Sequence, residues 1–297
     1  MILIRVVAVV AVLAACGSDG SSNAGSEDPY VVATTGIWAD VAGRVACDGS
    51  LSVRTIVPAG SDPHSFEPSL RDRETLDGAT LVVANGLGLE ETLDDTLEQV
   101  ESGGVPVFRA GDHVDTIGGD DPDPHVWLDP IRVAAALRAL GAALVDIGAD
   151  EAAIDECVTT AQAELAALDE ELAATFAAIP ADRRLLVTNH DALGYLADRY
   201  GFEIVGTVLP STSTLTEASA GELEELAAAI EAAAMPAIFT ERFAEAVDAI
   251  ALANRLGVDV VELYSDTLGE PGSGADTYGG MLRADAAAIT DALGCTG

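Results

Sequence analysis

One long stretch near the middle of the chain constrains its fold more than any other feature. Glu151–Ala178 contains 28 residues without Gly or Pro, and Leu165, Leu168 and Leu172 recur in it at helical spacing. As a single helix it would be about 42 Å long, at about 1.5 Å per residue. A connection within one βα unit does not need such a length. We therefore expect this helix to join two separate parts of the chain.

On both sides of this stretch, short runs rich in β-branched residues alternate with amphipathic segments. The expected strands are Tyr30–Thr34, Leu51–Val57, Thr80–Ala84, Val105–Arg109, Leu185–Thr188, Glu203–Leu209, Ala237–Thr240 and Asp259–Tyr264. The other expected helices are Ile37–Ala46, Arg71–Leu76, Glu90–Val100, Pro130 to about Gly148, Ala192–Tyr200, Glu222–Ala234, Ala244–Leu256 and Ala275–Leu293. Short apolar strands separated by helices are typical of parallel βα units. The pattern predicts an α/β fold of two lobes, residues 30–150 and 180–297, joined by residues 151–179.

Two of these helices carry recognisable start signals. Asp129 followed by Pro130 fits an N-cap with proline at the first helical position. Ser219 and Glu222 have the spacing of a capping box, in which each side chain bonds the other residue's backbone N–H.

The first residues predict export. The apolar run before Cys16 is about 10–14 residues long, which is too short to span a bilayer but suits a secretory signal. Cys16 follows Leu13-Ala14-Ala15, which resembles a bacterial lipobox. We therefore interpret residues 1–15 as a lipoprotein signal peptide, Cys16 as the lipidated residue and residues 16–29 as a flexible tether. The chain would then be lipid-anchored at the outer face of the plasma membrane or in the periplasm; the alternative is a plain signal peptide with a chance cysteine.

The net charge of the chain argues against two kinds of binding partner. The formal net charge of −36 disfavours binding to nucleic acid and to anionic membrane surfaces. A weak, non-specific attraction of cations is one reading of this charge, but a solvated acidic surface is the favoured one.

Three cysteines remain if Cys16 carries the lipid. In an oxidising compartment they suggest one disulfide and one free thiol, and they lack the close C-x-x-C spacing of a thiolate zinc site. Any two of Cys47, Cys157 and Cys295 could pair; Cys47 with Cys157 is the pairing we favour.

Three of the four histidines lie where strands or loops meet helices. His64 and His125 each end the tripeptide Asp-Pro-His, whose proline stiffens the loop that presents the imidazole. His190 follows the strand Leu185–Thr188, and Asp266 follows Asp259–Tyr264. Ligands of open α/β sheets collect at the carboxyl ends of strands. A cleft between the lobes could therefore gather two side chains from each lobe around one ion.

Three imidazoles and one carboxylate suit tetrahedral Zn²⁺, whereas Mn²⁺, our second choice, prefers more oxygen ligands. Asp266 is the weakest member, because aspartate often caps helices. Glu241 ends another strand and could support a ligand or replace one, although a purely structural carboxylate is the favoured reading. His113 lies in an acidic loop and is expected to stay outside the site. Metal affinity should fall below about pH 6, where imidazoles take up protons.

A zinc hydrolase is the main alternative from another class of protein, since catalytic zinc often has three protein ligands and a water. The chain has no His-Glu-x-x-His pair and no Gly-x-Ser-x-Gly elbow. If Asp266 completes the shell, no position is left for water. We therefore expect a binding protein with no catalytic residues.

Four segments together resemble the metal-binding proteins of zinc and manganese ABC importers, the ZnuA/TroA-like cluster A-I. They are Gly60–Pro68, Asp123–Pro130, Asn189–Gly201 and Tyr264–Gly269, and the similarity extends over nearly all of residues 30–293. The resemblance implies two Rossmann-like lobes bridged by a rigid helix, a metal in the cleft, and delivery to an ABC permease by a monomer.

The resemblance also implies a ligand set. In that family the first two ligands are histidines, matching His64 and His125. The third is His in zinc-type members and often Glu in manganese-type members, so His190 points to zinc. The fourth, where present, is Asp, matching Asp266. Many zinc-type members carry a long His-rich loop before the second ligand, whereas Gly111–Asp123 is short and acidic. A manganese importer component and a surface adhesin on the same scaffold remain alternatives.

Overall fold

The structure is a computed structural model that describes residues 28–46, 49, 51–243 and 246–294. The expected signal peptide, Cys16 and most of the tether lie outside the described residues, so those expectations stay predictions. Cys157 is disulfide-bonded. Because Cys47 and Cys295 also lie outside the described residues, the pairing with Cys47 remains a prediction as well. Within the described part of the chain, every helix is too short or too polar to span a bilayer.

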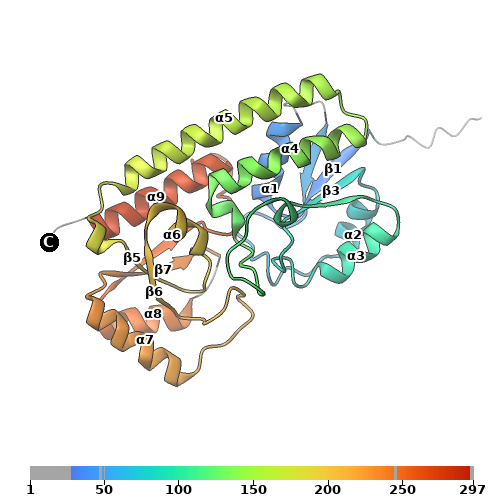
Figure 1. The fold of residues 1–297 in the computed structure, drawn as a ribbon. Helices are drawn as coiled ribbons and strands as arrows, with labels where there is room; N and C mark the ends of the chain where they lie inside the picture. The colour runs from blue at the N-terminus through green and yellow to red at the C-terminus, as the bar shows by residue number, and fades with distance from the viewer. Residues whose placement is uncertain (1–27, 47–48, 50, 244–245, 295–297) are drawn as a thin grey trace, which may run out of the picture.

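Two four-stranded parallel sheets form the two predicted lobes (Figure 1). The first sheet has the order β2-β1-β3-β4, with β1 (Tyr30–Ala33), β2 (Ser52–Thr55), β3 (Leu81–Ala84) and β4 (Val107–Arg109). The second has the order β6-β5-β7-β8, with β5 (Leu185–Thr188), β6 (Glu203–Thr207), β7 (Ala237–Glu241) and β8 (Asp259–Leu263). The strands follow the same spatial order in both lobes, and all pairs are parallel.

Helices cover both sheets, which is why the inner strands β1, β3 and β7 are buried at every position. The first lobe contains α1 (Gly36–Val45), α2 (Leu70–Asp77), α3 (Asp94–Ser102) and α4 (Pro130–Asp146), with the short 3₁₀ turns η1 (Ala110–His113) and η2 (Val126–Leu128). The second contains η3 (Ala181–Arg183), α6 (Gly194–Tyr200), α7 (Ala220–Ala233), α8 (Val247–Leu256) and α9 (Tyr278–Gly294). Asp129 caps α4 ahead of Pro130, and Ser219 forms the predicted capping box with Glu222.

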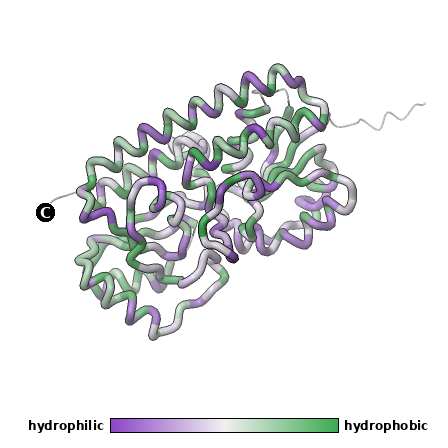
Figure 2. Tube along the Cα trace, viewed as in Figure 1, coloured by the Kyte–Doolittle hydropathy of each residue, from purple (hydrophilic) through white to green (hydrophobic). Residues whose placement is uncertain are grey.

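The long helix is α5 (Glu151–Phe176), whose 26 residues correspond to about 39 Å. It starts at the Asp150 cap and lies across both lobes, beside α4 and α9 (Figure 1). Apolar and polar residues alternate along it, as expected of a helix that buries one face (Figure 2). Its buried apolar residues belong to a core cluster that also contains residues of β1, α1, β5 and α9. This shared core, and not a flexible linker, connects the lobes.

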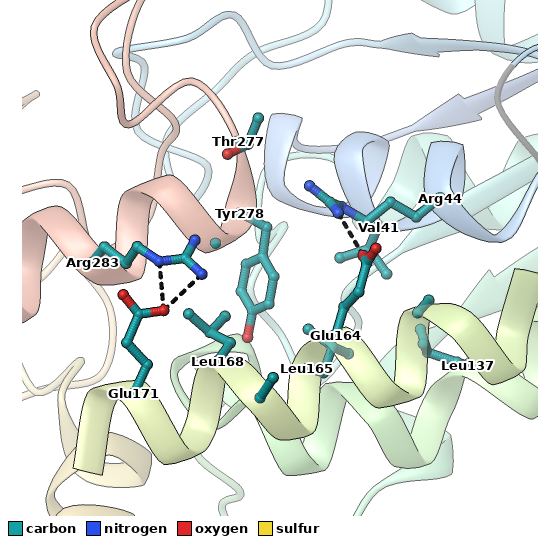
Figure 3. Close-up of a pocket in the computed structure, with 13 residues that line it drawn as sticks. Val41, Arg44, Leu137, Glu164, Leu165, Leu168, Glu171, Thr277, Tyr278 and Arg283 are labelled. Carbon is teal, nitrogen blue, oxygen red and sulfur yellow. Dashed lines mark hydrogen bonds and ion pairs between the residues drawn. The ribbon is translucent and has the colours of Figure 1, made fainter. Parts of the chain in front are cut away.

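Two ion pairs and one tyrosine mark where α5 meets the lobes (Figure 3). Glu164 pairs with Arg44 of α1, and Glu171 pairs with Arg283 of α9. These pairs are partly exposed and contribute little to stability. Tyr278, which lies between them, is fully buried, and its hydroxyl donates to the Trp127 carbonyl of the first lobe at 2.6 Å. The buried contact of Tyr278 with Trp127 therefore stabilises the junction of the lobes more than the two ion pairs do.

Four predicted helices start two to four residues later than expected, namely α3, α6, α8 and α9, and the difference is largest at α3. Glu90–Val100 was predicted to be helical throughout, but α3 begins at Asp94. The Glu90 carboxylate is fully buried and accepts hydrogen bonds from the Asn85 backbone N–H and the Thr34 hydroxyl, both at 2.7 Å. It closes the loop after β3, and this bonding outweighs the helical propensity of the segment.

Candidate metal centre

The structure brings together the four residues that the sequence singles out. His64 lies in the loop after β2, His125 directly before η2, His190 after β5 and Asp266 after β8. All four are buried, and one potential ligand atom from each lies within 4.8 Å of the others. Two of them come from each lobe, as the position of the strand ends predicts.

Three of the four form a tight face. Nε2 of His190 lies 3.2 Å from Nε2 of His125 and 3.4 Å from an Asp266 carboxylate oxygen. Nε2 of His125 lies 3.9 Å from the other Asp266 oxygen. Tetrahedral zinc with bonds of about 2.0–2.1 Å needs ligand separations of about 3.3 Å. The donors are thus spaced for one small ion, with His64 as the looser fourth corner.

Carboxylates orient two of the imidazoles. Nδ1 of His125 lies 2.7 Å from Asp123, and Nδ1 of His190 lies 2.6 Å from Glu241. Asn189 donates to the second Glu241 oxygen at 2.8 Å and fixes that side chain in turn. Each carboxylate accepts the Nδ1 proton, which leaves Nε2 free to face the centre, as metal-binding histidines require. Glu241 therefore touches His190 from behind and is not part of the four-residue cluster.

Sequence reasoning did not single out Asp123, although the signal was present in Asp-Pro-His. The first copy of the tripeptide behaves differently. Both aspartates accept from the backbone N–H of their own histidine at 2.9 Å, but Asp62 bonds the Thr214 hydroxyl, at 2.7 Å, and not the ring of His64. The nearest carboxylate to Nδ1 of His64 is Glu91, at 3.5 Å. The tripeptide Asp-Pro-His therefore orients the imidazole of His125 but leaves the imidazole of His64 only loosely held.

Unpartnered polar atoms point to a cation. Both ring nitrogens of His64 and both carboxylate oxygens of Asp266 are buried, and none has a hydrogen-bond partner among the described residues. Burying such groups without a partner costs about 1–3 kcal/mol each, and more for a charged group. A cation bound among the four side chains would partner one ring nitrogen of His64 and the carboxylate of Asp266.

Burial sets the charges of the site. It lowers the pKa of His64 to about 3, helped by the two neighbouring histidines, and it raises the pKa of Asp266 to about 8. Burial alone would lower the pKa of His190, but Asp266 and Glu241 outweigh it and raise the pKa to about 9. Near pH 7, His190 and Asp266 thus retain a proton as a pair. An incoming cation must displace it.

The fourth histidine lies elsewhere. His113 is exposed at the end of η1, and its ring stacks on Phe108 at a centroid distance of 4.8 Å. It is not part of the cluster, in agreement with the sequence-based expectation.

Comparison with known proteins gives a consistent result. The family model for the periplasmic component A of the zinc-uptake complex matches residues 31–292. The manganese-binding lipoprotein MntA of Halalkalibacterium halodurans is 32% identical over 94% of this chain and 93% of its own. The zinc-binding protein TroA of Treponema pallidum is 32% identical over 92% of each chain. The manganese ABC transporter substrate-binding lipoprotein ScaA of Streptococcus gordonii is 25% identical over 95% of this chain and 94% of its own.

The fold is similar as well. The solved structure of the Treponema pallidum protein superposes with a TM-score of 0.85 and covers 91% of this chain and 100% of that one.

Proposed function

The chain belongs to the family of periplasmic zinc-uptake components A, and on that premise we propose that it captures a divalent transition metal outside the cytoplasm and hands it to an ABC permease. The observation that carries the proposal is the buried group of His64, His125, His190 and Asp266, whose potential ligand atoms lie within 4.8 Å of one another and include unpartnered atoms of His64 and Asp266. Relatives are named for binding and transport, and the chain is not an enzyme. In the proposed site all four donors come from protein, so no position is left for a reacting water.

Zinc is the metal we propose. Three imidazole nitrogens and one carboxylate oxygen match its tetrahedral, borderline-soft preference. Manganese is the alternative, because some relatives are named for manganese and others for zinc. Mn²⁺ prefers more oxygen donors than the four side chains supply. We therefore expect zinc to win a direct competition.

Metal analysis and histidine variants test this proposal together. Protein purified without added metal should contain zinc, and metal-free protein should bind one equivalent in a chelator competition. His64→Ala, His125→Ala and His190→Ala should each weaken binding strongly, because each removes a donor. His113→Ala is the matched control, since it removes the one histidine outside the cluster. Near-normal affinity in any of the first three, or a comparable loss in the control, would refute the assignment.

The relatives' names indicate an ABC-import lipoprotein with a permease partner. We further propose that lipidated Cys16 anchors the protein to the outer face of the plasma membrane through the tether, that residues 30–150 and 180–297 act as lobes around residues 151–179, and that the protein is a monomer. Replacing Cys16 by Ala should shift the protein from the membrane to the soluble fraction of exporting cells. Membrane retention of Cys16→Ala would contradict the anchor.

A further inference from the structure

One hydrogen bond crosses the cleft next to the proposed ligands. The indole N–H of Trp127 donates to the Ser265 carbonyl at 2.7 Å. Trp127 follows His125 by two residues in the first lobe, and Ser265 directly precedes Asp266 in the second. The Trp127 side chain is 1% exposed, and its ring lies 5.2 Å from the His125 ring. One buried residue therefore contacts ligand-bearing segments of both lobes.

The segment that Trp127 holds is strained. Ser265 has a φ of +27°, a region that residues with a Cβ rarely adopt. Such a conformation persists only where the surroundings fix it. On the side of its own lobe, the Asp285 carboxylate accepts from the backbone N–H groups of Tyr264 at 2.8 Å and Ser265 at 3.2 Å. On the other side, Trp127 holds the Ser265 carbonyl.

Asp266 depends on this backbone more than His125 and His190 depend on theirs. His125 and His190 are each oriented by a carboxylate. Neither carboxylate oxygen of Asp266 has a hydrogen-bond partner among the described residues. The place of this side chain therefore depends on the backbone that carries it. From the first lobe, Trp127 bonds that backbone at Ser265, and the Gly60 N–H donates to the side chain of Thr267 on the other side of Asp266 at 2.8 Å.

Resting on the proposed metal binding, we propose that Trp127 is the positioning residue that holds Asp266 in line with the three histidines. The Tyr278 hydroxyl, which donates to the Trp127 carbonyl at 2.6 Å, fixes Trp127 from α9. Asp266 is thus available as the fourth ligand only while the two lobes keep their positions relative to each other. Loss of the indole contact frees Asp266 first and leaves a three-histidine site from which the metal dissociates more easily.

The test is a double-mutant cycle between Trp127 and Asp266 in the complete protein, read with zinc affinity and with the visible spectrum of the Co²⁺ form. Trp127→Phe keeps an aromatic ring but removes the donor. It should weaken zinc binding roughly three- to tenfold, as expected for one net hydrogen bond. It should also change the Co²⁺ absorption toward that of Asp266→Ala, because water replaces the carboxylate. In an Asp266→Ala background, Trp127→Phe should have no further effect.

The chain offers a matched control. Trp38 is the other tryptophan, equally buried, and its indole donates to Asn85 within the first lobe at 2.9 Å. Any effect of Trp38→Phe on zinc affinity should be the same with Asp266 present or replaced. If Trp127→Phe does not fold, Tyr278→Phe replaces it, with the same expectation of a loss that disappears in the Asp266→Ala background.

The outcomes separate the two proposals. If the unmodified protein binds neither Zn²⁺ nor Co²⁺, the proposed function fails. If it binds both, but Trp127→Phe leaves affinity and spectrum unchanged or adds fully to Asp266→Ala, the function stands and the positioning role of Trp127 is overturned.

Discussion

Zinc binding at neutral pH should release a proton from the pair formed by His190 and Asp266. The pKa of His190 is raised to about 9, with burial opposing and Asp266 and Glu241 favouring the charged form, while burial raises the pKa of Asp266 to about 8. The raised pKa of His190 depends on an ionised Asp266, so the two side chains share one proton instead of holding one each. Metal binding needs both groups deprotonated.

The magnitude follows from the linkage between pH and binding. Removing a proton from a group whose pKa is raised well above 7 lowers the apparent affinity at pH 7, here on the order of a hundredfold. Because this group is protonated below its raised pKa, affinity should rise about tenfold between pH 7 and pH 8 and level off near pH 9. His64, with a pKa lowered to about 3, does not add to the loss until far more acidic conditions. The expectation that affinity begins to fall only below about pH 6 is therefore revised upward.

Calorimetry can count this proton directly. Titrating zinc at pH 7 in buffers of different ionisation enthalpy should give heats whose slope corresponds to about one proton released. The Asp266→Asn variant should release fewer protons on binding zinc, because an amide does not stabilise a charged His190. The His113→Ala variant should release as many protons as the unmodified protein. Heats that do not depend on the buffer would refute the shared proton, and an undiminished release from Asp266→Asn would refute its cause.

Three further predictions concern stability, orientation and motion. Free zinc at about 100 times its Kd should raise the free energy of unfolding by about 2.7 kcal/mol, because the ion binds only the native state, and a thermal melt with and without chelator should show a rise in Tm that chelation abolishes. Glu241→Gln should weaken zinc affinity by about 10- to 100-fold, because it removes the charge behind His190. Glu91→Gln should weaken zinc affinity much less, because Glu91 is 3.5 Å from His64 and 37% exposed. Equal losses of affinity in the two variants would contradict the orienting role of Glu241. Small-angle scattering should show little compaction on adding zinc, since α5 and a shared core bind the lobes together, and a large compaction would disprove that rigidity.

Local patterns were enough to predict the strands, the long helix and the four clustered side chains. Each depends on features that a sequence carries directly, namely burial periodicity, capping residues and prolines that stiffen a loop. The late start of α3 was not predictable in this way. Whether Glu90 points outward from a helix or inward to bond the Asn85 backbone depends on the space behind β3, which no local pattern encodes.

The two Asp-Pro-His tripeptides show the same limit within the site. Both aspartates accept from the backbone N–H of their own histidine, but Asp123 also bonds the ring of His125, whereas Asp62 bonds Thr214 of the opposite lobe. Identical residues take different partners because the loops face different surroundings. The contact between Trp127 and the Asp266 segment is hidden for the same reason, since 138 residues separate its two ends.

The division of the proposed ligands between the lobes explains how a tight site can also be a carrier. Each lobe contributes only two donors, so neither lobe alone offers the four-coordinate shell that zinc prefers. Holding the lobes in register makes all four available, and a displacement much smaller than a hinge opening is enough to break half of the bonds. The rigid helix and the shared core are therefore compatible with release. If Trp127 positions Asp266 as proposed, a change within the cleft, and not at a flexible linker, decides whether the shell is complete.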